Sequence, residues 1–263
     1  MQVTTTACGR GPAWRARAAL LLGVAALVCG CTQAPDQPGG QPPSSASVRV
    51  KDLSAFKDRK GAAPLRSIVA EAVGRQVDVY AKPGATSVQR KLGPPHDGAA
   101  ALVLLVAEQR GDWVKVLLPV RPNGSSGWVR SKQVRLSHHD FHIVIGLKAH
   151  TITVYDGAKV IDREPVGLGR QRTPTPSGLY YTTELIRPPN PNGAYGPYAY
   201  ALSGFSEVLK TFNGGEPFLG IHGTNDPSGL GKDVSHGCIR MSNKGISKLA
   251  KLLPLGVPVI VEP

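Results

Sequence analysis

The stretch that decides the fold is "FLGIHGTNDPSGLGKDVSHGCIRMSN", Phe218 to Asn243, near the end of a 263-residue chain. It places His222, His236 and Cys238 in one short run that is rich in Gly and Ser. Three interpretations are open: a buried thiol that happens to lie near two histidines, a metal site, or a nucleophile with its base. The spacing and the surrounding residues bear on each of them.

A zinc site is the weakest of the three interpretations. The spacing H-x13-H-x-C matches no common zinc signature, and no CxxC pair or second pair of histidines completes a tetrahedral set. A buried cysteine that acts as a small apolar side chain stays possible on residue count alone. We therefore expect neither a metal nor an organic cofactor.

The run "SHGC" suits a nucleophile. Gly237 lets the chain turn tightly beside the sulfur of Cys238, and successive backbone N–H groups at such a turn can converge on an anion. A thiolate beside converging amides has what acyl transfer needs, except a base. His222 ends the predicted strand "FLGIH" sixteen residues before Cys238, and it can supply the base if the intervening segment folds back.

The stretch "GIHGTNDPSGLGKDVSHGCIRMSN" resembles the signature of the YkuD-type L,D-transpeptidases, in which a histidine precedes a Ser-His-Gly-Cys run by about sixteen residues. The resemblance covers residues 142–262 and includes "TPTPSG" and "YGPYAYALSG". Many family members have Asn two residues after the cysteine, where this chain has Arg240, a difference between subtypes.

The resemblance implies a role for each matching position. Cys238 is the expected nucleophile, His222 its base, and the backbone carbonyl of Gly223 orients the imidazole. The expected oxyanion hole consists of the amides of three consecutive residues: His236, Gly237 and Cys238.

Further residues are expected to bind substrate. Ser235, His236 and Arg240 would shape the pocket, and the charge and position of Arg240 suit a substrate carboxylate. Tyr195 and Tyr198, in "NGAYGPYAY", would either line the acyl-donor cleft or pack against the core.

The implied enzyme is a cysteine acyltransferase that acts on peptidoglycan stem peptides. Its thiol would attack the L-centre of diaminopimelate, expel the terminal D-Ala, and pass the acyl group to a second stem as a 3–3 cross-link. Water as acceptor would make it an L,D-carboxypeptidase, and a D-amino acid or a protein amine are further acceptors. The same thiol would open carbapenem rings. The alternative from another class is a non-catalytic wall-binding lipoprotein.

Residues 1–30 are expected to be a lipoprotein signal peptide. Three arginines precede the apolar run "AALLLGVAALV", and "LVCGC" resembles a lipobox with Cys31 as the lipidated first mature residue. A transmembrane anchor is the alternative, but the apolar run is short for it. The protein is thus predicted to be exported and attached by lipid to the outer face of a membrane, or periplasmic, and to act on the wall.

The charge of the chain fits that location. The net charge is +13, from 31 basic and 18 acidic residues, which suits anionic wall polymers or lipid headgroups. Export and the lack of Lys/Arg blocks exclude nucleic acid as a partner. If Cys8 and Cys29 leave with the signal and Cys31 carries lipid, Cys238 is the one remaining thiol. We expect a monomer.

The fold is expected to be mainly β. Residues 31–72 are predicted to be a Pro/Gly/Ser-rich tether and linker, with a short helix near "LRSIVAEAV". Residues 73–137 resemble a bacterial SH3-like barrel, in which Trp113 and Trp128 either pack or stack on a ligand. Residues 138–263 are expected to be the catalytic domain, a β-sandwich or barrel with few helices and one clear helix over Asn243–Leu253.

Overall fold

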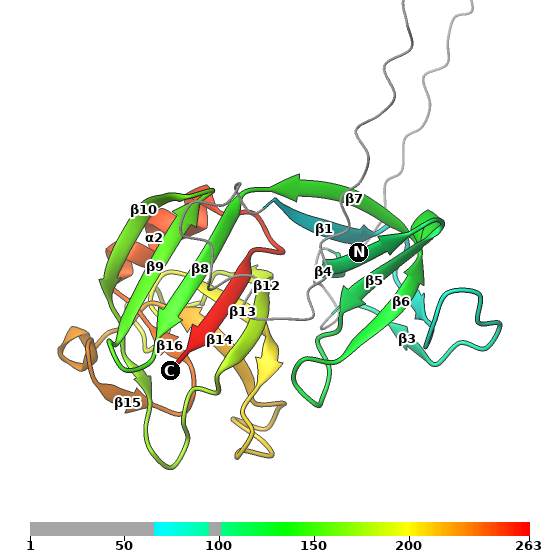
Figure 1. Cartoon of the computed structure of the whole chain (residues 1–263). Helices are drawn as coiled ribbons and strands as arrows, with labels where there is room; N and C mark the ends of the chain where they lie inside the picture. The colour runs from blue at the N-terminus through cyan, green and yellow to red at the C-terminus, as the bar shows by residue number, and fades with distance from the viewer. Residues whose placement is uncertain (1–65, 95–100) are drawn as a thin grey trace, which may run out of the picture. The chain divides into compact units, whose positions relative to one another are not determined.

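The computed structural model describes residues 66–94 and 101–263 (Figure 1). The signal peptide predicted over residues 1–30, the lipidation site Cys31 and the tether up to residue 65 lie outside the described residues. The described residues all belong to one compact unit, which spans Ser45–Pro263. None of their helices is long and apolar enough to cross a membrane.

The first part of the unit is a small antiparallel sheet. Its five strands follow the order β6-β5-β4-β1-β7 and are β1 (Ser67–Ala72), β4 (Val103–Arg110), β5 (Trp113–Leu117), β6 (Ser126–Arg130) and β7 (Val134–His139). A hairpin of β2 (Val77–Val79) and β3 (Arg90–Leu92) is joined to β6 by a bridge between Tyr80 and Trp128, and the 3-10 turn η1 (Ser131–Gln133) precedes β7. The SH3-like identity of this part stays a prediction.

The helix predicted near "LRSIVAEAV" is wrong, because Ser67–Ala72 forms strand β1. β1 lies between β4 and β7 and pairs with both, so its backbone groups are satisfied on two sides. Such pairing outweighs the weak helical preference of its alanines, while Ile68 and Val69 favour a strand. The sheet therefore begins inside the segment that was assigned to the linker, 31–72.

Both tryptophans of the first sheet are packed. Trp113 and Trp128 are buried in a cluster with Tyr80, whose ring meets that of Trp113 edge-on at 5.1 Å between centroids. The Arg130 guanidinium covers the ring of Trp113 at 4.3 Å. This arrangement favours a packing role for the two tryptophans, because a ring that stacks on a ligand needs an open face.

The second part is a mixed sheet of eight strands. In the order β10-β9-β8-β17-β12-β13-β14-β16 it contains β8 (Phe141–Gly146), β9 (Thr151–Asp156), β10 (Lys159–Pro165), β12 (Gly178–Ile186), β13 (Ala199–Phe205), β14 (Phe218–His222), β16 (Ile239–Arg240) and β17 (Pro258–Glu262). A separate parallel pair joins β11 (Leu168–Gly169) to β15 (Asp233–Ser235). The stretch "YDGAKV" forms the hairpin turn between β9 and β10.

The core of this second part lies between the sheet and one helix. α2 (Asn243–Leu252) begins after its N-cap Ser242, where the sequence predicted a helix, and buries Ile246 and Leu249. A short 3-10 turn, η2 (Pro227–Gly229), lies in the segment between β14 and β15. The chain is mainly β, with one α-helix in the part that is described, as the sequence predicted.

Candidate active site

Strand β14 brings the predicted base and nucleophile to one face. Its sequence "FLGIH" alternates, and Leu219 and Ile221 enter the apolar core. Because successive side chains of a strand point to opposite faces, Gly220 and His222 share the other face. The sulfur of Cys238 lies on that face, since a Cβ atom on Gly220 would be 4.0 Å from it and the Gly220 amide donates a hydrogen bond to it.

The parallel pairing of β14 with β16 fixes this arrangement. Ile221 lies opposite Ile239, and His222 lies opposite Arg240. The backbone N–H of Met241 also donates to the carbonyl of His222 at 2.9 Å. Cys238 directly precedes β16, so the strand pairing sets its position relative to His222.

His222 is held as a neutral imidazole. Its side chain is 4% exposed, and burial lowers its pKa to about 4, with a smaller contribution from the charge of Arg240. Its Nδ1 atom lies 2.6 Å from the carbonyl oxygen of Gly223. A carbonyl only accepts hydrogen bonds, so Nδ1 carries the proton and Nε2 keeps its lone pair. The ring can therefore accept a proton at neutral pH.

Cys238 is held as a neutral thiol. Burial raises the pKa of this half-buried residue, while the hydrogen bond from the Gly220 amide and the charge of Arg240 act in the opposite direction. The thiol also lies 3.9 Å from the carbonyl oxygen of Phe218. At neutral pH the site thus holds a protonated thiol and, on the same face of β14, an imidazole with a free lone pair.

The turn that carries Cys238 is held from both sides. Gly237 has φ +124°, a conformation that favours glycine. The buried hydroxyl of Ser235 donates to the carbonyl of Cys238 at 2.6 Å and accepts from the amide of Gly237 at 3.0 Å. The hydroxyl of Thr175 donates to the carbonyl of Gly237 at 2.9 Å. Ser235 therefore shapes the turn from within rather than facing the pocket.

The same hydrogen bonds correct the predicted oxyanion hole. The Gly237 N–H is used by the Ser235 hydroxyl, so it is not free to bind an oxyanion in this conformation. The N–H groups of His236 and Cys238 have no acceptor among the residues that the structure describes. These two amides are the donors that remain for the oxyanion.

Arg240 and Tyr195 border the site. The Tyr195 ring lies 4.8 Å from that of His222, and burial together with the nearby Cys238 raises the pKa of its hydroxyl. The Nε atom of Arg240 is buried and has no hydrogen-bond partner in the described part of the chain. Tyr198 instead packs against the core, with the Arg187 guanidinium 5.5 Å from its ring centre.

No group of three or more His, Cys, Asp and Glu side chains among the described residues could hold a metal ion. His222 and Cys238 lie on one face of β14, while His236 is exposed and its ring lies 5.6 Å from that of Phe212. The three candidate ligands therefore do not converge.

Known proteins are similar to this chain in sequence. The family model of the L,D-transpeptidase catalytic domain, YkuD, matches residues 140–261. The YqjB protein of Bacillus subtilis (strain 168), which bears the L,D-transpeptidase name, is 30% identical over 135 residues that cover 46% of this chain and 71% of that protein. The chain belongs to the YkuD family of L,D-transpeptidases. YkuD of the same organism is 36% identical over 122 residues, which cover 46% of this chain and 66% of that protein.

The chain thus spans about two thirds of the length of this YkuD relative. An L,D-transpeptidase structure from Mycobacterium smegmatis aligns with a TM-score of 0.39 at 18% identity, over 64% of this chain and 96% of that one.

Three site residues of this L,D-transpeptidase domain were missed in the sequence. Gly220 donates to the thiol, and Thr175 supports the Gly237 turn although it lies in the quoted "TPTPSG". The Asn243 side chain accepts from the Thr224 amide at 2.9 Å and lies against Gly223. Alternation in "FLGIH" was a usable signal for Gly220, whereas the other two contacts join segments that are far apart in sequence.

Proposed function

We propose that the chain is an L,D-transpeptidase that forms 3–3 cross-links in peptidoglycan through a thioester on Cys238. The observation that carries the proposal is the arrangement on β14. The neutral imidazole of His222, oriented by Gly223, and the thiol of Cys238 lie on one face of the strand beside two amides without acceptors. Family membership supports the reaction class, a transferase acting on peptidoglycan.

The first half-reaction forms the acyl-enzyme. The sulfur of Cys238 attacks the carbonyl carbon at the L-centre of diaminopimelate in a stem tetrapeptide, and Nε2 of His222 takes the thiol proton. The resulting oxyanion accepts from the amides of His236 and Cys238. The C–N bond to the terminal D-Ala then breaks, and the imidazolium returns the proton to the departing amine.

The second half-reaction transfers the acyl group. The side-chain amine of a second stem attacks the thioester and gives its proton to His222. The new amide is the cross-link, and the sulfur leaves as the thiolate and is reprotonated. Arg240, with its unpartnered Nε, is the candidate for holding a carboxylate of the donor stem.

The rest of the predicted organisation belongs to the same proposal. A lipid on Cys31 and the tether that follows it would hold the catalytic part against the wall. The SH3-like part would contact wall polymer or position the enzyme, and the basic charge of the chain would favour these anionic surroundings.

Mass spectrometry of the products tests the proposal. The purified protein and a Cys238→Ala variant are incubated with a disaccharide tetrapeptide that contains diaminopimelate. A dimer that has lost one D-Ala, absent with the variant, supports cross-linking by this thiol. Loss of D-Ala without a dimer indicates an L,D-carboxypeptidase. If no product forms and no carbapenem adduct appears on Cys238, the result supports the alternative of a non-catalytic wall-binding protein.

A further inference from the structure

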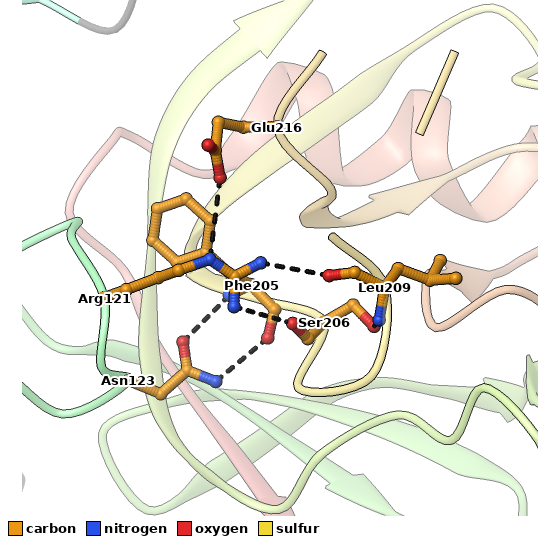
Figure 2. A network of polar contacts seen from close by, with 6 residues as sticks. All are labelled: Arg121, Asn123, Phe205, Ser206, Leu209 and Glu216. Carbon is orange, nitrogen blue, oxygen red and sulfur yellow. Dashed lines mark hydrogen bonds and ion pairs between the residues drawn. The ribbon is translucent and has the colours of Figure 1, made fainter. Parts of the chain in front are cut away.

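The loop between β5 and β6 of the first sheet reaches across to the second sheet. Asn123, in this loop, forms two hydrogen bonds with the backbone of Phe205, the last residue of β13 (Figure 2). Its amide nitrogen donates to the Phe205 carbonyl at 2.9 Å, and its oxygen accepts from the Phe205 N–H at 2.9 Å. A side-chain amide that binds one residue in both directions fixes that backbone in one orientation.

Arg121 of the same loop binds the segment that follows. Its guanidinium donates to the carbonyl of Ser206 at 2.9 Å and to that of Leu209 at 3.3 Å, and it lies 4.9 Å from the ring centre of Phe205. Its Nε atom is also 3.6 Å from a carboxylate oxygen of Glu216 (Figure 2). Arg121 thus contacts both ends of the segment 206–217, which connects β13 to β14.

This connecting segment lies beside the catalytic turn. It reverses direction at a tight turn in which Phe212 and Gly215 exchange two backbone hydrogen bonds, with Asn213 and Gly214 in the left-handed region. The Phe212 ring lies 5.6 Å from the ring of His236. At the end of the segment the carbonyl of Phe218 lies 3.9 Å from the sulfur of Cys238.

The two sheets also contact one another away from this loop. Tyr181 of β12 is fully buried among the apolar residues of the first sheet, and its hydroxyl donates to the carbonyl of Leu117 at 3.1 Å. Arg121, by contrast, has an exposed side chain, and its hydrogen bonds all go to the connecting segment. The hydrogen bonds of Arg121 therefore act on the segment, and those of Asn123 fix the end of β13 from which the segment starts.

We propose that Arg121 and Asn123 are positioning residues of the active site. They hold the segment 206–217 so that Phe212 and Phe218 form the wall of the site against the turn that carries His236 and Cys238. The first sheet thereby contributes to recognition of the peptide donor, whatever else it binds. The part that concerns the donor rests on the proposed function.

The segment itself provides a test that does not depend on catalysis. Lys210 is exposed within it, so trypsin can cleave after this residue whenever the segment leaves its place. We expect the Arg121→Ala/Asn123→Ala variant to be cleaved there at least about tenfold faster, because local opening then costs less free energy. The matched control is Arg135→Ala, which removes an exposed arginine of the same sheet whose partner is Glu71, 3.9 Å away. Arg121→Lys keeps the charge but not the fork of donors, and it should be intermediate.

The second readout compares a large and a small reagent at Cys238. Acylation by the tetrapeptide donor should fall about tenfold in the double variant, because a misplaced wall no longer orients the donor. Alkylation by iodoacetamide should stay within about twofold, because this reagent does not need the wall. A purely structural role would change both rates together.

Each outcome decides the proposal. Unchanged cleavage after Lys210, or an equal fall of acylation and alkylation, would overturn it. Faster cleavage together with a selective fall in acylation supports it. If the unmodified protein is alkylated but never acylated by the tetrapeptide, the proposed function fails, and cleavage after Lys210 alone decides whether the two residues hold the segment.

Discussion

The Nδ1 atom of His222 lies 2.6 Å from the carbonyl oxygen of Gly223, its own neighbour in the chain. This contact takes the place of the carboxylate that orients histidine in many hydrolytic triads. A carbonyl fixes the tautomer without adding a negative charge. The imidazolium of the proposed reaction would therefore be stabilised less, which fits a ring whose pKa is lowered to about 4.

Substitution Gly223→Ala should misplace this carbonyl. A Cβ atom there would lie 2.3 Å from the side-chain oxygen of Asn243 and 3.0 Å from the Cα atom of Gly196. The backbone must shift to relieve these contacts, and we expect acylation of Cys238 to fall about a hundredfold. The measurement is the rate of carbapenem adduct formation by mass spectrometry. Gly74→Ala, whose Cβ would come no closer than 4.0 Å to its nearest neighbour, serves as the control. An unchanged rate in Gly223→Ala would refute the orienting role.

The thiol should be protonated at rest near pH 7, so that only a small fraction reacts as thiolate. Burial raises the pKa of Cys238, and the lowered pKa of His222 means that the imidazole is neutral there, with its one proton on Nδ1. The rate of alkylation by iodoacetamide should therefore climb steadily from pH 6 to about pH 9, because the thiolate fraction rises with pH. A preformed thiolate–imidazolium pair would instead give a constant rate over pH 6–8. A plateau in that range would contradict the neutral pair.

Burial of His222 should also make the fold sensitive to acid. Its pKa falls from the ordinary 6.5 to about 4 on folding, so its contribution to stability is complete above pH 6.5 and is lost as the pH falls toward 4. The lowering corresponds to a free energy of roughly 3 kcal/mol. The measurement is the free energy of unfolding in urea at pH 7 and at about pH 4. Between these two pH values it should fall by about 3 kcal/mol more in the unmodified protein than in His222→Gln. Equal losses in the two proteins would mean that His222 is not buried as a neutral ring.

The approach of His222 to Cys238 was predictable because its signal is local. The spacing of His222 from Cys238 and the alternation of "FLGIH" both lie within one short stretch, and the strand pairing uses that same stretch. The hydrogen bond from the Gly237 N–H to the Ser235 hydroxyl was not predictable. It depends on which way the Ser235 hydroxyl turns, and serine hydroxyls accept or donate equally well.

Long-range contacts account for most of what the sequence did not show. Arg121 and Asn123 lie in the short loop "LPVRPNGS", more than 80 residues before the residues they bind, and no periodic pattern marks them. Strand β1 was mistaken for a helix for a related reason. Its short sequence suits either structure, and only the neighbours β4 and β7 decide between them.

The N-cap of α2 gives a test of how the helix supports the site. The Ser242 hydroxyl accepts from the Gly245 amide at 2.9 Å and donates to Glu164 at 2.7 Å, and burial raises the pKa of that carboxyl group. Ser242→Ala leaves both partners without this hydroxyl and should lower the free energy of unfolding by about 1–2 kcal/mol.

A control for this cap lies in the same helix. Ser247 donates only to the carbonyl of Asn243 within α2, at 2.7 Å, so Ser247→Ala should cost less than about 0.5 kcal/mol in urea unfolding. α2 begins at Asn243, whose side chain binds the Thr224 amide next to Gly223. Fraying of the first turn should thus also slow carbapenem acylation of Cys238 in Ser242→Ala but not in Ser247→Ala. If both variants lose stability and acylation equally, the cap does not act on the site.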